Sequence, residues 1–257
     1  MVEGPTAKAY AVKISRGFRG EVVKSVFVRS KRIFAPVERL VGKKFLNADS
    51  FGKNIVLLFD GIAVRLHLMM YGTIHIYGKD EPLLKPEERV RLRIEGEARK
   101  LVVYNAPIVE INEKESLLKA LREGLGPDPL SNEWDRSKAV KNIMGFPDDK
   151  IGVILLNQSV IAGIGNILRN EILFRVKVHP ERRVKDLSYE ELERIVEVSE
   201  SLSKEFLKLK LEGKRIKSIL FVYNRYRKPC KVCGKPIRYY MQEPIKRKTF
   251  VCDHCQK

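Results

Sequence analysis

The chain has 257 residues, of which 44% are hydrophobic and 32% are charged. This length suits more than one folding unit, and no apolar run is long enough to span a bilayer. The first residues include charges and no apolar signal-peptide core, which argues against secretion. We therefore expect a cytoplasmic protein rather than a membrane-bound or exported one.

The formal net charge of +18 is unevenly distributed along the chain. Residues 204–257 contain 16 Lys and Arg against four acidic residues, so two thirds of the excess lies in the last fifth of the sequence. Such an excess favours a nucleic acid partner, because neutralising phosphates releases counterions and dominates the affinity. An anionic membrane surface, or a purely solubilising role, is the alternative.

The spacing of apolar residues predicts a sheet region that follows one short helix. Residues 4–16 are expected to be helical, with Pro5 tolerated in the first turn. Closely spaced strands with glycine-containing turns then indicate an antiparallel β-sandwich. The expected strands are Glu21–Arg29, Lys43–Ala48, Asn54–Phe59, Ala63–Leu68, Thr73–Tyr77, Val90–Glu95 and Lys100–Tyr104.

A linker rich in Gly and Pro, residues 124–130, ends the sheet region. Beyond it, apolar residues recur at helical spacing, and Tyr189–Leu211 is expected to form one long helix that starts after Ser188. From about Tyr226 the chain becomes a short cysteine-bearing module. The predicted fold class is α+β with several domains: a β-sandwich over 1–124, a helical domain over 125–222 and a small module over 223–257.

All four cysteines lie in this module, as two CxxC pairs. Paired CxxC motifs at this separation favour tetrahedral coordination of one zinc ion, and two disulfides are the alternative. Four thiolates would leave no open coordination position, so the zinc would be structural and would stabilise a module too small to have its own core. The predicted ligands are Cys230, Cys233, Cys252 and Cys255, with His254 a bystander.

Three consecutive cations, Lys246, Arg247 and Lys248, precede the second CxxC pair, where a zinc ribbon makes a hairpin. Consecutive cations at a hairpin tip predict a phosphate-binding element, and a solvated turn is the alternative.

Three further motifs precede the cysteine-bearing module along the chain. The chain opens Met1-Val2-Glu3-Gly4-Pro5, and the run Leu125-Gly126-Pro127-Asp128-Pro129-Leu130 precedes the sequence LLNQSVIAGIGNI at residues 155–167. Together they resemble the formamidopyrimidine-DNA glycosylase and endonuclease VIII family over the whole chain. The resemblance implies an N-terminal β-sandwich, a helix–two-turn–helix domain and a C-terminal zinc finger, and a monomer that binds damaged or abasic DNA near the nucleoid of a prokaryote.

The resemblance also implies the chemistry. In that family the amine exposed by removal of the initiator Met attacks the deoxyribose, expels the damaged base and forms a Schiff base. Here the amine would belong to Val2, whereas most members expose a proline, and Glu3 would move protons at the sugar. Valine would give a primary-amine imine instead of the fixed cationic iminium of proline, which leaves the second (δ) elimination open. Thr6 stands where many relatives have a second glutamate, which leaves the details of ring opening and the choice of damaged base open.

The DNA contacts implied by the resemblance fall on three separate segments. Lys53, in the turn after Phe51-Gly52, matches the lysine that lies near the lesion, so it joins Val2 and Glu3 as a catalytic candidate. Asn166, at the start of a helix, would bind a phosphate with the helix-terminal amides. Arg247 matches the finger arginine that contacts phosphates beside the flipped nucleotide.

Extruding a base leaves a hole that an apolar side chain must fill. The segment around Met69, Met70 and Tyr71 matches the family's wedge loop, and packing of the methionines in the core is the alternative. His67, just before the loop, is interpreted as structural.

Two differences from formamidopyrimidine-type members predict the branch of the family that the chain resembles. Tyr104-Asn105-Ala106-Pro107 is not followed by the Arg and Phe usual in formamidopyrimidine-type members, and little chain separates the long helix from Cys230. Both favour an endonuclease VIII-like preference for oxidised pyrimidines. Two other classes stay open: a non-catalytic binder of damaged DNA, and an RNA- or ribosome-associated zinc-ribbon protein.

Overall fold

The computed structural model describes residues 2–30, 32–34 and 36–257, which form two compact units. The first unit comprises Val2 and residues 6–123, and the second comprises residues 3–5 and 124–257. The short segment Glu3–Pro5 belongs to the second unit because the Gly4 N–H donates to the Gly163 carbonyl at 2.9 Å. Each unit has its own hydrophobic core.

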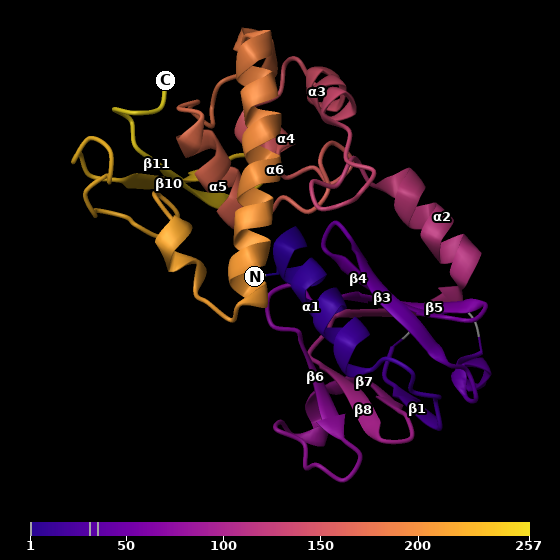
Figure 1. The fold of residues 1–257 in the computed structure, drawn as a ribbon. Coiled ribbons are helices and arrows are strands. Elements are labelled where there is room, and N and C mark those ends of the chain that lie inside the picture. The colour runs from indigo at the N-terminus through magenta and orange to yellow at the C-terminus, as the bar shows by residue number, and fades with distance from the viewer. Residues whose placement is uncertain (1, 31, 35) are drawn as a thin grey trace. The chain divides into compact units, whose positions relative to one another are not determined.

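Two β-sheets and helix α1 (Gly4–Gly17) make up most of the first unit (Figure 1). One sheet has the strand order β1-β7-β8-β6 and is antiparallel throughout, and the other has the order β2-β9-β5-β4-β3. The short pair β2–β9 is parallel. The strands are β1 (Ser25–Val28), β2 (Arg32–Ile33), β3 (Phe45–Phe51), β4 (Asn54–Phe59), β5 (Ile62–His67), β6 (Thr73–Gly78), β7 (Val90–Glu95), β8 (Arg99–Tyr104) and β9 (Ile108–Glu113).

The core of this unit follows directly from the periodicity of its elements. Alternate residues of β7 are buried, as expected for a strand with one face on the core. In α1, Ala7, Ala11 and Ile14 are buried at helical spacing and pack in the same cluster as residues from both sheets. Short 3₁₀ turns at Val37–Leu40 and Glu87–Arg89 connect the strands.

The structure differs from the sequence prediction mainly at element boundaries. The strand predicted over Glu21–Arg29 forms only over Ser25–Val28, because Val22 pairs instead with Lys44 in an isolated bridge. Strand β9 and helix α2 (Lys114–Gly124) were not predicted, since no turn residue separates the alternating segment from the helical one.

The second unit contains four further helices, and the longest, α6, is the orange helix of Figure 1. Helix α6 begins with a capping box, in which the Ser188 hydroxyl accepts from the Glu191 N–H and the Glu191 carboxylate accepts from the Ser188 N–H. In the described part of the chain no helix combines the length and apolar character needed to cross a membrane. The helices are α3 (Arg136–Met144), α4 (Ile151–Ile154), α5 (Asn166–Arg175) and α6 (Tyr189–Leu211), with 3₁₀ turns at Val184–Asp186 and Ile216–Ile219.

The C-terminal module is a hairpin of β10 (Arg238–Gln242) and β11 (Arg247–Val251) beside the four cysteines. Its small core includes Phe174, Val222, Ile237 and Phe250, so part of that core comes from helix α5 rather than from the module itself.

Candidate functional site

Val2 is anchored within the first unit at both its side chain and its backbone. The side chain is 8% exposed and packs in the core cluster. The backbone N–H donates to the Met69 carbonyl at 3.0 Å. The nitrogen predicted to become the nucleophile is therefore held at a defined place beside the predicted wedge loop.

The loop predicted to act as a wedge (Met69–Tyr71, called the wedge loop below) presents three large apolar side chains to solvent. Met69 is 49%, Met70 52% and Tyr71 75% exposed. The alternative of core packing is therefore wrong for these residues. The Gly72 N–H closes the loop on the Leu68 carbonyl at 2.8 Å, and an added Cβ at Gly72 would meet that oxygen at 2.7 Å. Only glycine fits this closure without a shift.

Lys53 lies, as predicted, in the two-residue turn between β3 and β4, after Gly52 with a positive φ of 56°. Burial, and then the positive charges of Lys53 and Arg65, lower the pKa of His67. The neutral His67 ring accepts the Met69 N–H on its Nδ1 at 3.2 Å. His67 thus supports the start of the wedge loop, in line with its structural interpretation.

Glu3 is fully buried in the second unit, where its carboxylate lies on the N-terminus of helix α5. Its Oε1 accepts from the Ile167 N–H at 2.6 Å and its Oε2 from the Leu168 N–H at 3.1 Å. Both donors and the positive end of the helix stabilise the negative charge. Two of the helix-terminal amides, those of Ile167 and Leu168, are thus occupied by the Glu3 carboxylate, and phosphate binding at the start of this helix stays a prediction.

The glycine-rich motif gives Glu3 the space it occupies. A Cβ at Gly165 would lie 2.6 Å from the Glu3 carboxyl carbon and from Oε1. A Cβ at Gly4 would lie 2.9 Å from Cα of Gly163, which itself has a φ of +87°. The Gln158 side chain fixes the loop by accepting from the Gly163 N–H and donating to the Ile164 carbonyl, at 3.0 Å in both cases.

Asn166 begins helix α5, as predicted, but its side chain is 6% exposed and engaged inside the second unit. Its Nδ2 donates to the Lys248 carbonyl at 2.9 Å, and its Oδ1 accepts from Arg169 at 2.7 Å. The side chain therefore joins helix α5 to the finger hairpin. A direct contact between Asn166 and DNA stays a prediction.

Arg169 is a buried cation that sequence reasoning missed. Its guanidinium donates to the Gly152 carbonyl, the Gln242 amide oxygen and the Thr249 hydroxyl at 3.0, 2.6 and 2.7 Å. Burial lowers the pKa of Arg169 to about 10, so it remains charged at neutral pH. It ties α4, α5 and both strands of the hairpin together.

The sequence pattern indicated that Arg169 faces solvent rather than the protein interior. Asn166, Arg169 and Asn170 share one helical face, which normally faces solvent. The structure turns this polar face toward the hairpin, where the Asn170 side chain also accepts the Phe250 N–H at 2.6 Å.

Arg247 opens strand β11 and is exposed, as are Lys246 and Lys248 beside it. The predicted hairpin is present, with Gln242 opposite Arg247 in the register. Because Thr249 and the Lys248 carbonyl are bound to Arg169, the backbone that carries Arg247 is fixed while its side chain remains available to a ligand.

The four cysteines form one cluster in which all sulfur atoms lie within 4.8 Å of one another. The sulfurs of Cys230 and Cys255 are 3.9 Å apart, and those of Cys233 and Cys252 are 3.4 Å apart. A tetrahedral zinc site with bonds of about 2.3 Å places its sulfurs roughly 3.8 Å apart, whereas a disulfide needs about 2.05 Å. The residues fit a metal ion and do not form disulfides.

Removing the metal is expected to weaken DNA binding. Cys233→Ser, or treatment with a chelator, should release the bound metal ion and loosen the hairpin that carries Arg247. DNA affinity should fall at least about tenfold, because one charge-assisted hydrogen bond alone contributes about 1.5–3 kcal/mol. Metal content and DNA titration check this. His254→Ala, which changes an exposed residue between two ligands, should keep both the zinc and the affinity; equal affinity with and without metal would contradict the prediction.

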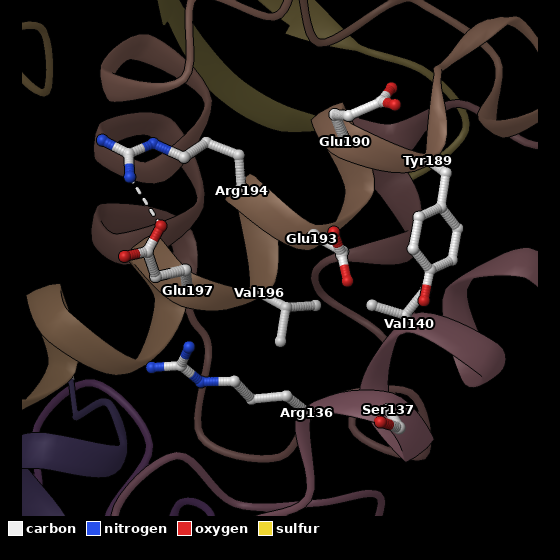
Figure 2. Close-up of a pocket in the computed structure, with 9 residues that line it drawn as sticks. All are labelled: Arg136, Ser137, Val140, Tyr189, Glu190, Glu193, Arg194, Val196 and Glu197. Atoms are coloured by element: carbon white, nitrogen blue, oxygen red, sulfur yellow. Dashed lines mark hydrogen bonds and ion pairs between the residues drawn. The ribbon is translucent and has the colours of Figure 1, made fainter.

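A pocket of about 350 Å³ in the second unit lies between α3 and the first half of α6 (Figure 2). Val140 and Val196 line its apolar part, and Glu190, Glu193 and Glu197 contribute carboxylates. Its described lining includes none of the predicted site residues. Arg136 and Arg194 also line the pocket and pair with Glu200 and Glu197, and because no predicted site residue lies here, we do not place the damaged base in it.

Family models match most of the chain. The formamidopyrimidine-DNA glycosylase N-terminal domain matches residues 1–107, and the formamidopyrimidine-DNA glycosylase H2TH domain matches residues 125–218. A ribosome-associated zinc-ribbon protein would account for neither match.

Named relatives and solved structures agree with these matches. Formamidopyrimidine-DNA glycosylase of Listeria innocua and endonuclease 8 1 of Mycobacterium tuberculosis are each 30% identical and align over the whole of both chains. Structures of MutM with DNA containing carbocyclic 8-oxo-G, and of Lactococcus lactis Fpg with abasic-site DNA, superpose with TM-scores of 0.87 at 22% identity, covering 99% of each chain. The predicted resemblance and fold class are confirmed: the chain belongs to the formamidopyrimidine-DNA glycosylase family.

Proposed function

We propose that this chain is a bifunctional DNA glycosylase and abasic-site lyase that excises oxidised bases, with a preference for pyrimidines. The observation that carries the proposal is the position of the Glu3 carboxylate, which lies against Gly165 at the start of helix α5. This buried carboxylate belongs to the residue that directly follows Val2 in the chain. Covalent catalysis by an amine needs a group that moves protons, and the carboxylate of the next residue in the chain is the candidate for that group.

The nucleophile is the α-amine of Val2 after removal of Met1. An α-amine with a pKa near 7.7–8 is roughly one third neutral at pH 7.5, whereas an ordinary lysine is only about 0.1% neutral. The neutral nitrogen attacks C1′ of the deoxyribose, the C1′–base bond breaks, and the base leaves with a proton taken from water. The C1′–O4′ bond then opens, the nitrogen electron pair forms the imine, and O4′ takes up a proton.

Glu3 is proposed to carry the protons of these steps, first from the amine and then to O4′. The imine acidifies the C2′–H bond. Loss of that proton breaks the C3′–O bond and releases the 3′ phosphate, so the strand is cut by β-elimination. Lys53 is the candidate for contact with the DNA near the lesion. Thr6 cannot act as a second carboxylate, so we expect δ-elimination to be slower than β-elimination.

DNA binding is assigned to Asn166, Arg247 and the wedge loop of Met69, Met70 and Tyr71. The exposed apolar side chains of the loop have the size needed to fill the space of an extruded base. We also propose the three-domain division at 1–124, 125–222 and 223–257, with one structural zinc ion held by the four cysteines.

Arg247→Ala is expected to weaken binding to abasic DNA and to lower the slope of log affinity against log salt by about 0.9, the value for one lost phosphate contact. The matched control is Arg194→Ala. Arg194 is an exposed cation of the same unit that pairs with Glu197 at the acidic pocket (Figure 2), and its removal should leave the slope unchanged. Titrations at four salt concentrations measure both slopes. Parallel slopes for wild type and Arg247→Ala would remove Arg247 from the interface.

The activity is tested with duplexes that carry thymine glycol, dihydrouracil, 8-oxoguanine or an abasic site. We expect faster release of the two pyrimidine lesions than of 8-oxoguanine, and strand ends typical of β-elimination. The absence of the Arg and Phe after Pro107 supports this preference. Faster release of 8-oxoguanine would reverse it.

A non-catalytic binder of damaged DNA is the second candidate, favoured by Val2 in place of proline and by Thr6. Borohydride reduction separates the two functions, because only a Schiff base becomes a permanent protein–DNA adduct. An adduct with abasic DNA supports the enzyme, and tight binding with no adduct supports the binder.

A further inference from the structure

The backbone and the side chain of Met69 have different surroundings. Its carbonyl accepts the N–H of Val2 at 3.0 Å, while its side chain is 49% exposed at the start of the wedge loop. Both residues belong to the first unit, so this contact lies within one compact body. The backbone of Met69 thus contacts the residue that carries the proposed nucleophile, while its side chain is exposed to solvent.

The backbone at Met69 is held in an uncommon conformation. Its φ is +49°, in the left-handed region that few residues other than Gly, Asn and Asp adopt. Two hydrogen bonds enforce it: His67 Nδ1 accepts the Met69 N–H, and the Leu68 carbonyl accepts the Gly72 N–H. The positive φ sets the direction of the carbonyl that Val2 contacts.

We propose that Met69 is a positioning residue for the N-terminal amine, and that the loop which replaces the extruded base also orients the nucleophile. The inference rests on the proposed function. When Met1 is removed, one N–H of the amine keeps the Met69 carbonyl as its acceptor, and rotation about the Cα–N bond is restricted. The lone pair of the neutral amine then points away from the carbonyl. A reactant held in a near-attack geometry reacts faster than one that rotates freely.

Two substitutions test the backbone role and the side-chain role of Met69 separately. Met69→Asn removes the apolar side chain but tolerates the positive φ, whereas Met69→Ile keeps an apolar side chain but is β-branched and disfavours that φ. Single-stranded abasic DNA has no paired base to extrude, so the side chain is dispensable there while the orientation of the amine is not. A duplex with a damaged base requires both.

On single-stranded abasic DNA we expect Met69→Ile to form the reduced Schiff base at a single-turnover rate about tenfold lower than that of Met69→Asn, because only the isoleucine disfavours the positive φ. On a duplex lesion Met69→Asn should also be slow. Gly72→Ala, which disrupts the closure on Leu68, should repeat the effect of Met69→Ile and provides the test if that variant does not fold.

Met144→Ile is the matched control, because Met144 is a methionine of similar exposure that has no positive φ and lies outside the predicted site. It should react with single-stranded abasic DNA as fast as wild type. Equal rates for Met69→Ile, Gly72→Ala and wild type on that substrate would overturn the inference while leaving the proposed function intact. Failure of wild type to form any adduct would instead overturn the proposed function.

Discussion

A chain that carries a tag before Val2 is expected to cut abasic DNA on the order of several hundred-fold more slowly than the same chain after the tag is removed. This factor is the ratio of the neutral fraction of an α-amine to that of a lysine at about pH 7.5. The reason is chemical. A blocked Val2 nitrogen is an amide, whose electron pair is delocalised and does not attack carbon, so only lysines remain. Binding of abasic DNA should persist, since the wedge loop and Arg247 are unchanged.

The comparison uses one preparation, in which a protease removes the tag and leaves Val2 as the first residue. Strand cleavage and DNA affinity are measured before and after removal, and intact mass establishes which terminus is present. Retention of full cleavage by the tagged chain would move the nucleophile to a lysine, with Lys53 the first to examine.

Gly165→Ala is expected to reduce strand cleavage by about 100-fold, which corresponds to the loss of one to two charge-assisted hydrogen bonds of about 1.5–3 kcal/mol each. The new Cβ would lie 2.6 Å from the carboxyl carbon of Glu3, so the carboxylate must leave the amides of Ile167 and Leu168. A displaced Glu3 carboxylate would leave the position from which it is proposed to move protons.

The control for Gly165→Ala is Gly124→Ala, because a Cβ at Gly124 meets nothing within 4 Å. Both variants are compared with wild type by thermal unfolding and by single-turnover cleavage under saturating enzyme. Saturation removes any difference in DNA affinity from the rate. If Gly165→Ala cleaved DNA as fast as wild type, the position of the Glu3 carboxylate would be unimportant for the reaction.

Features that depend on local sequence were predicted well. The long helix Tyr189–Leu211 has the bounds its periodicity and Ser188 indicated, and the turn at Gly52 and Lys53 joins two strands as expected. The four cysteines converge because their spacing already restricts them to one small ribbon. In each case neighbours in the sequence determine the outcome.

Features that depend on distant contacts were not predictable from the residues. Glu3 lies 164 positions before Ile167, and nothing in the pattern of either segment pairs them. Asn166 and Arg169 form a polar helical face that normally indicates solvent, and only the hairpin placed against it makes that face buried. Polar partners far apart in sequence leave no periodic signal.

The central claim is covalent chemistry at the nitrogen of Val2. The most direct measurement is mass spectrometry of the borohydride-reduced adduct with abasic DNA after proteolysis. The account predicts that the sugar remnant is attached to the α-nitrogen of the peptide that begins with Val2 and Glu3. A remnant attached to Lys53 or to any other lysine would contradict it.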